Sequence, residues 1–332
     1  MDNNRKTSIE ERKRQRKKYL IKKKKRKNRI RLIALLLVIG LVFLILNKFL
    51  SKGKKPAEED INILEEGKEV VKKEKEPVDK DFQKEKNKDL EKRLDSYLTK
   101  NKLDKDELGL VYFNLDSDET FSRNGKREFL AGGTTNIALN FLYYDLAKEG
   151  KINLEKTLAS QKEDFENAYG PLKESKAGDQ FNLQSLLHMS IDKVDTVSRN
   201  ILVRNIETEL GKPFNQLVYK KYGIRIGKEN KISAQEGMKM IQYLEKNKNT
   251  NILYKMIISD MLDNSYESYG SKYLKEKRIC HKIGYVGTYH SDMGIVYSEQ
   301  PYIYVILTNY NSSEIVSDIS SIVNTWHNYY NK

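Results

Sequence analysis

Hydrophobic positions recur at helical spacing in several stretches of this chain. In residues 89–98, the apolar positions Leu90, Leu94, Tyr97 and Leu98 lie three to four residues apart, which predicts a helix. The same spacing, followed by Gly150, predicts a helix over residues 136–149. Further helices are predicted at residues 183–189, 197–210, 234–246 and 314–330. The region from about residue 89 to the C-terminus is therefore rich in helices.

Strand-like patterns lie at both ends of this helical region. Residues 108–115 (LGLVYFNL) predict a strand, a turn follows at 116–119, and a short strand is predicted at 120–122. Near the C-terminus, residues 294–297 and 302–309 alternate well enough to predict two more strands. Terminal strands with helices between them indicate a mixed α/β domain, an α+β sandwich. We expect its terminal strands to form one antiparallel sheet flanked by helices, together with a helical part.

A different apolar pattern lies near the N-terminus. Residues 32–46 are uninterrupted apolar residues, and the flanking positions extend the stretch to about the length of a membrane span. A cleaved signal peptide is the alternative, but no small-residue cleavage site follows, and the chain continues NKFLSKGKK. We therefore expect residues 32–50 to be one uncleaved transmembrane helix, with residues 51–87 forming a charged spacer that cannot order itself.

Charge is concentrated before this apolar run. Residues 1–31 carry 16 Lys and Arg against three acidic residues, which is +13 of the chain's formal net charge of +14. The positive-inside bias places residues 1–31 in the cytoplasm as a basic tail and the rest outside the cell. A nucleic-acid-binding arm is the alternative for the tail. Contact with anionic lipid explains it more simply, so we expect no nucleic-acid partner.

Composition restricts the chemistry of the outer domain. The single cysteine, Cys280, excludes an intrachain disulfide and a cysteine-based zinc site. The chain has four histidines, and no two of them are spaced i, i+4. We therefore expect neither a metal nor another cofactor.

Three local segments carry a resemblance to a known family. Residues 128–139 read EFLAGGTTNIAL and run into a predicted helix, residues 186–202 read LLHMSIDKVDTVSRNIL, and residues 278–296 read RICHKIGYVGTYHSDMGIV. Their order and spacing resemble those of the class A β-lactamase and penicillin-binding serine hydrolases, which carry S-x-x-K, S-D-N and K-T-G in that order. The resemblance covers residues 88–332 and implies a β-lactamase-like fold for that domain.

The same resemblance shows which motif residues differ. The family's serine and lysine correspond to Gly133 and Asn136. The S-D-N positions hold Lys193, Val194 and Asp195, and the K-T-G positions hold Lys282, Ile283 and Gly284. The segment between the second and third motifs contains no convincing E-x-x-L-N, the source of the deacylating glutamate in class A enzymes. No catalytic set is intact, since Gly133 has no nucleophile and an amide at Asn136 cannot accept a proton near neutral pH.

Two other sets of residues could replace the missing serine and lysine. Thr134 could act with His281 or His290, but we expect both histidines to be structural. The S-x-x-K spacing also occurs at Ser190 and Lys193, where the serine would lie on a different helix. Neither substitute restores the family's geometry from the sequence alone.

The sequence therefore favours a membrane-anchored extracytoplasmic domain that no longer acylates and instead binds cell-wall material or a protein partner. Lys193, Asp195, Lys282 and Thr134 are the candidate ligand-binding residues, and two lysines beside one carboxylate favour an anionic ligand such as peptidoglycan. The alternatives are an active β-lactamase or D-alanyl-D-alanine peptidase with a non-standard nucleophile, and a purely structural envelope protein.

Overall fold

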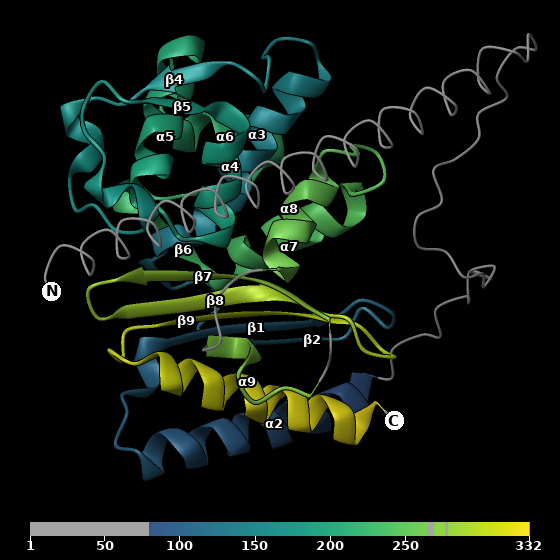
Figure 1. Ribbon diagram of the computed structural model, residues 1–332. Helices are drawn as coiled ribbons and strands as arrows, with labels where there is room; N and C mark the ends of the chain where they lie inside the picture. The colour runs from purple at the N-terminus through teal and green to yellow at the C-terminus, as the bar shows by residue number, and fades with distance from the viewer. Residues whose placement is uncertain (1–79, 264–268, 276–277, 332) are drawn as a thin grey trace, which may run out of the picture. The chain divides into compact units, whose positions relative to one another are not determined.

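The two terminal strands of the domain lie side by side in one antiparallel sheet (Figure 1). The computed structural model describes residues 80–263, 269–275 and 278–331. In it, Leu108 of β1 (Leu108–Asn114) pairs with Thr308 of β9 (Tyr302–Thr308). The sheet has the order β2-β1-β9-β8-β7. Its other strands are β2 (Thr120–Arg123), β7 (Ile279–Val286) and β8 (Tyr289–Val296).

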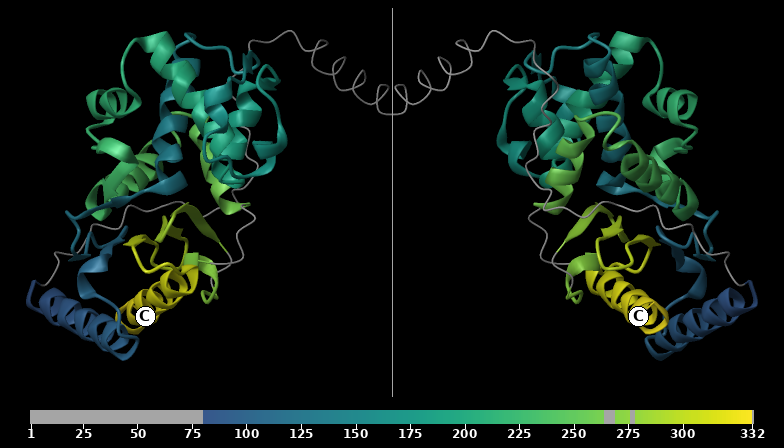
Figure 2. Two further views of the ribbon diagram at one scale, coloured as in Figure 1. Left: turned by 90° about the vertical axis from the view of Figure 1, so that its left-hand side faces the viewer. Right: turned by 90° about the vertical axis from the view of Figure 1, so that its right-hand side faces the viewer.

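Both faces of this sheet are buried. Leu110 and Tyr112 of β1 pack in one hydrophobic cluster with the helices α2 (Lys80–Lys100) and α9 (Ser313–Tyr330), while Val111 between them packs in a second cluster on the opposite face. Side chains alternate between the faces of a strand, so burial on both sides explains the nearly continuous apolar sequence of β9. The side views show α2 and α9 next to each other on one side of the sheet (Figure 2).

The opposite side of the sheet carries the other labelled α-helices (Figure 1). Helix α7 packs on β1, β8 and β9, and α8 packs on β7. These helices are α3 (Asn136–Lys148), α4 (Leu183–Asp192), α5 (Thr196–Leu210), α6 (Phe214–Tyr222), α7 (Ala234–Asn247) and α8 (Tyr254–Leu262). Two short ladders complete the helical part, β3 (Glu128–Leu130) with β6 (Lys231–Ser233) and β4 (Thr157–Ala159) with β5 (Gln180–Asn182).

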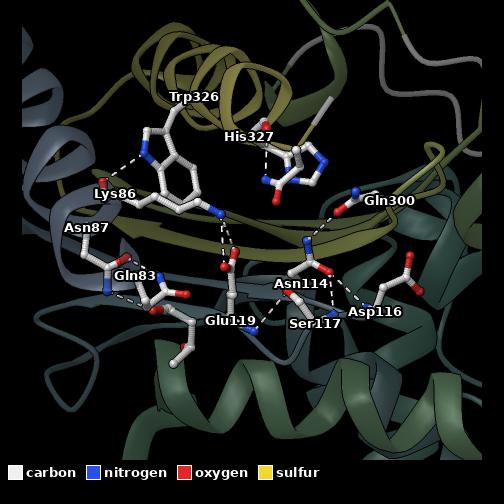
Figure 3. A network of polar contacts seen from close by, with 12 residues as sticks. Gln83, Lys86, Asn87, Asn114, Asp116, Ser117, Glu119, Gln300, Trp326 and His327 are labelled. Carbon is white, nitrogen blue, oxygen red and sulfur yellow. Dashed lines mark hydrogen bonds and ion pairs between the residues drawn. The ribbon is translucent and has the colours of Figure 1, made fainter. Parts of the chain in front are cut away.

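A buried ion pair joins α2 to the sheet (Figure 3). Lys86 Nζ lies 3.0 Å from both carboxylate oxygens of Glu119, and both side chains are almost fully buried. The backbone carbonyl of Lys86 also accepts a 3.0 Å hydrogen bond from the Trp326 indole on α9. One residue of α2 thus contacts both the sheet and the last helix.

The structure contains most of the predicted elements but extends some of them, and the strand predicted at 294–297 begins at Tyr289. The strands and helices predicted at 108–115, 136–149, 302–309 and 314–330 are present with small shifts at their ends. The helix predicted at 89–98 is longer, because α2 begins at Lys80, inside the segment predicted as spacer. Burial of Lys86 against Glu119 accounts for this extension, since a lysine in a charged stretch gives no sign in the sequence of its buried partner.

The helices α6 and α8 were not predicted. In the described residues, no helix combines the length and the apolar character needed to cross a bilayer. The predicted basic tail, the transmembrane helix at 32–50 and most of the spacer lie outside the described residues.

Candidate functional site

A cavity of about 710 Å³ lies where the helical part meets β7. The turn before α3 forms one wall through Gly132 and Gly133, and the first turn of α5 forms another. The hairpin between β7 and β8 closes the third side through Tyr285 and Gly287. All three motif-like segments of the sequence therefore line this one cavity.

Glycines allow the backbone segments around the cavity to approach closely. Gly132 has φ = +53°, and a β-carbon at this position would lie 2.4 Å from the backbone nitrogen of Tyr285. A β-carbon on Gly284 would lie 2.1 Å from the carbonyl oxygen of Ala131. No side chain fits at either distance, so glycine is required for β7 to pack against this turn. Gly284 thus shapes the site without lining the cavity.

Lys282 lies directly behind Gly133. Its side chain is 0% exposed, and its Nζ is 3.4 Å from the position that a β-carbon on Gly133 would occupy. Burial lowers the pKa of the Lys282 ammonium to about 7, although the carboxylates of Asp292 and Asp192 oppose that shift. Near neutral pH this amine exists in both protonated and neutral forms. A partly neutral amine can accept a proton, but Gly133 presents no hydroxyl to it.

The segment matching S-D-N places its three residues differently. Asp195 is fully buried and forms the N-cap of α5, where its carboxylate accepts hydrogen bonds from the backbone nitrogens of Ser198 and Leu172 and from the Ser198 hydroxyl. Val194 lines the cavity at φ = +50°, a strained conformation for a β-branched residue. The Lys193 side chain is 41% exposed, and its Nζ contacts Asp192 at 2.7 Å. Lys193 does not line the cavity.

The Asn136 side chain connects three helices around the cavity through hydrogen bonds. Its side-chain amide donates to the carbonyl of Ser190 at 2.9 Å, and its Oδ1 accepts from the guanidinium of Arg199 at 2.6 Å. Asn136 therefore links the starts of α3 and α5 to the end of α4. The amide performs a structural role at the position that the resemblance assigns to the family's lysine.

The hydroxyl groups near Gly133 are engaged elsewhere. The Thr134 hydroxyl is fully buried and donates to the Ala131 carbonyl at 2.8 Å. The Ser190 hydroxyl is also buried and donates to the Leu187 carbonyl at 2.7 Å, while the S-x-x-K partner Lys193 contacts Asp192. Neither hydroxyl is oriented into the cavity as a free nucleophile.

The two candidate histidines have partners of their own. His281 Nδ1 lies 2.9 Å from the Asp292 carboxylate on the sheet face opposite to Lys282, as alternation along β7 predicts. His290 Nδ1 lies 3.0 Å from the Tyr269 hydroxyl, and burial lowers the pKa of His290. Within the described ranges, no three His, Cys, Asp or Glu side chains form a candidate metal site.

Two of the polar cavity residues that the sequence interpretation missed interact with each other. Arg199 lies on the first turn of α5, and Asn230 lies at the end of a short turn before β6; both line the cavity. Arg199 Nη2 donates to Asn230 Oδ1 at 3.1 Å. The spacing of Arg199, four residues after the N-cap Asp195, is the sequence signal that could have identified it, because that position shares a helix face with the cap.

Comparisons with known proteins agree with this geometry. No match was found among curated proteins. Among solved structures, PBP-A as an acyl-enzyme complex with penicillin G is 18% identical, with a TM-score of 0.63, covering 77% of this chain and 98% of that chain. A β-lactamase from Sphaerobacter thermophilus is 16% identical, with a TM-score of 0.59, covering 67% and 92%. TLA-1 extended spectrum β-lactamase is 17% identical, with a TM-score of 0.58, covering 72% and 98%.

At these identities the similar structures establish the fold, an α/β β-lactamase-like architecture. The family assignment rests on the sequence. A model described as the β-lactamase enzyme family matches residues 89–329, which is most of the chain. With the cavity, the three motif-like segments and this match in agreement, the chain belongs to the β-lactamase enzyme family.

Proposed function

We propose that this protein is a membrane-anchored extracytoplasmic member of the family that does not acylate and instead binds cell-wall material or a protein partner in the cavity. One observation carries the proposal. Gly133 lies at the cavity wall in front of Lys282, at the position that the resemblance assigns to the nucleophile, and it offers no side chain to a substrate.

The neighbouring groups support the same conclusion. The Thr134 and Ser190 hydroxyls are fully buried, and each donates to a backbone carbonyl. Covalent catalysis of acyl transfer needs a hydroxyl or thiol that reaches the substrate and a base within hydrogen-bond distance of it. Loss of the nucleophile of such a mechanism removes orders of magnitude of rate. The cavity itself remains open and large enough for a small ligand.

The acylation test uses the full-length chain purified in detergent. We expect no mass increase after incubation with penicillin G, measured by intact-protein mass spectrometry, while a penicillin-binding protein in the same assay is labelled fully. A stoichiometric adduct would overturn the proposal. Loss of that adduct in the Thr134→Ala variant would then assign the activity to an unusual threonine nucleophile.

The membrane anchor is a separate part of the proposal. It rests on the apolar run at residues 32–50 and on the +13 charge that precedes it. Protease added to intact cells stripped of their wall should digest the domain but not residues 1–31, which an N-terminal epitope tag would detect. Complete protection of the domain, or its release as a soluble shortened chain, would contradict this arrangement.

A further inference from the structure

A single guanidinium in the cavity is held in place by neutral groups. Arg199 Nη1 donates to Asn136 Oδ1 at 2.6 Å, and Nη2 donates to Asn230 Oδ1 at 3.1 Å. The Arg199 side chain also lies over the Phe214 ring, with Cζ 5.6 Å from the ring centroid. These three neighbours fix the position of the guanidinium and leave its remaining N–H groups for other acceptors.

The orientation of both amides is determined by their other bonds. Asn136 Nδ2 donates to the Ser190 carbonyl, and Asn230 Nδ2 donates to the Gly132 carbonyl at 2.9 Å. Each amide therefore directs its oxygen toward Arg199. Such an arrangement orients the guanidinium without neutralising its charge.

No acidic residue that the structure describes near the cavity forms an ion pair with this guanidinium. Among residues 80–263, 269–275 and 278–331, no carboxylate forms an ion pair with Arg199. Asp195 is occupied by backbone and hydroxyl donors, Asp164 on the outer side of α5 pairs with Arg204 at 2.8 Å, and Glu166 lies exposed at the rim. Burial lowers the pKa of the Arg199 guanidinium to about 10, although the carboxylate of Glu207, which forms no ion pair with it, opposes that shift. Arg199 nevertheless stays charged at neutral pH.

The mouth of the cavity is aromatic and apolar. Tyr169 is 58% exposed, Tyr285 is 49% exposed and Val286 is 42% exposed, and all three line the cavity. Exposed aromatic side chains around a recessed charge suit a ligand with an anionic group and a less polar body.

We infer that this cavity recognises a carboxylate through Arg199, with the body of the ligand lying against Tyr169 and Tyr285. Arginine is suited to this task because its planar fork matches a carboxylate in a bidentate geometry. The inference rests on the proposed function, a cavity that binds without acylating. A peptide terminus and an acidic sugar both present this group, and matched probes distinguish these two sources.

Ligand-observed NMR titration of the full-length protein in detergent tests the inference with two pairs of probes. N-acetyl-alanyl-alanine is compared with its C-terminal amide, and N-acetylmuramic acid is compared with N-acetylglucosamine, which lacks the lactyl carboxylate. We expect at least one acid to bind about tenfold more tightly than its neutral match, the effect of one charge-assisted hydrogen-bonded contact. The pair that shows the preference identifies the source of the carboxylate.

Variants assign the preference to one residue. Arg199→Met should abolish the difference between acid and neutral probe. Arg225→Met, which removes an equal charge from an exposed position outside this cavity, should leave it unchanged. If Arg199→Met fails to fold, Arg199→Gln decides instead, because its amide can still donate to Asn136.

Equal binding of acid and neutral probes by the wild type, no binding of any probe, or a preference that survives both Arg199 variants would overturn the inference. The result of the acylation test does not depend on any of these outcomes. Failure of carboxylate recognition can therefore be distinguished from failure of the proposed function. A penicillin adduct on the wild type would remove the proposed function whatever the probes show.

Discussion

The Nζ atom of Lys282 lies 3.4 Å from the position that a β-carbon on Gly133 would occupy. The same β-carbon would lie 3.0 Å from Val194 Cγ1 and 3.3 Å from the Ile283 carbonyl oxygen. A small side chain therefore fits at residue 133 only if its neighbours move by a few tenths of an ångström. If it fits, it lies next to an amine whose burial lowers its pKa to about 7.

A serine at position 133 should restore acylation. In Gly133→Ser, the hydroxyl would lie within reach of Lys282, whose neutral form can accept its proton. We expect a penicillin G adduct by mass spectrometry that the wild type does not form. It should form faster as the pH rises from 6 to 8, because the neutral fraction of Lys282 grows across its pKa. Gly133→Ala introduces the same β-carbon without the hydroxyl and should stay unlabelled. Absence of label on Gly133→Ser throughout this pH range would show that Lys282 does not act as a base.

Lys282 should also make stability depend on pH. Its pKa is lower in the folded protein than the ordinary value of 10.5, so between about pH 7 and 10.5 the unfolded chain binds more protons than the folded one. The free energy of unfolding should therefore rise with pH in this window, by at most about 1.4 kcal/mol per unit from this group. Urea unfolding can be followed by fluorescence of Trp326, the single tryptophan of the chain, which is buried.

The slope belongs to Lys282 only if a variant removes it. Lys282→Met should flatten the rise between pH 7 and 9, while Lys193→Met, at an exposed lysine, should keep the wild-type slope. Parallel curves for the wild type and Lys282→Met would contradict the lowered pKa.

The close contact at Gly284 should be sensitive to a single methyl group. In Gly284→Ala, the new β-carbon would lie 2.1 Å from the Ala131 carbonyl oxygen, so β7 and the turn before α3 must separate. We expect a loss of about 3 kcal/mol or more, or failure to fold, since backbone on one side cannot rotate away. Gly287→Ala meets no atom within 4 Å but keeps φ at +57°, so it should cost only about 1 kcal/mol. Equal losses in the two variants would show that the close contact at Gly284 adds no cost beyond that of the strained backbone at Gly287.

The buried ion pair of α2 should behave as a coupled unit. Lys86→Met leaves the Glu119 carboxylate buried without its cation and should cost about 3–5 kcal/mol. The double variant Lys86→Met/Glu119→Leu removes both charges and should recover most of that loss. A double-mutant cycle measured by urea unfolding gives the coupling energy directly. Additive losses would mean that the two residues do not stabilise each other.

The fold was predictable from sequence where burial produces a regular pattern. Strands β1 and β9 and helices α3 and α9 carry long apolar patterns, and their pairing follows from their positions at the two ends of the domain. Helix α6 has only nine residues and is held by the buried side chains of Phe214 and Val218. Such a short helix is marginal in isolation, so packing partners decide its existence and the local sequence does not.

The candidate site was predictable only in part, for a similar reason. Spacing between the motif-like segments brought Gly133, Asn136 and Asp195 to one cavity. It also placed Lys193 there, but the strained backbone of Val194 and the contact with Asp192 leave that lysine outside the lining. Arg199 was missed because its role depends on the amide oxygens of Asn136 and Asn230, which the fold and not the local sequence brings to its guanidinium.

The pairing of β1 with β9 has a consequence for how the protein is made. Strand β1 is synthesised early, yet its neighbours β2 and β9 lie near opposite ends of the domain in sequence. As the chain is synthesised from its N-terminus, β1 has the edge that pairs with β9 and the face that α9 covers exposed until residues 302–330 follow. Contacts so distant in sequence form slowly, and the chain is prone to aggregation until they have formed. Premature termination before Tyr302 should therefore leave a product for proteases to degrade, and not a smaller folded domain.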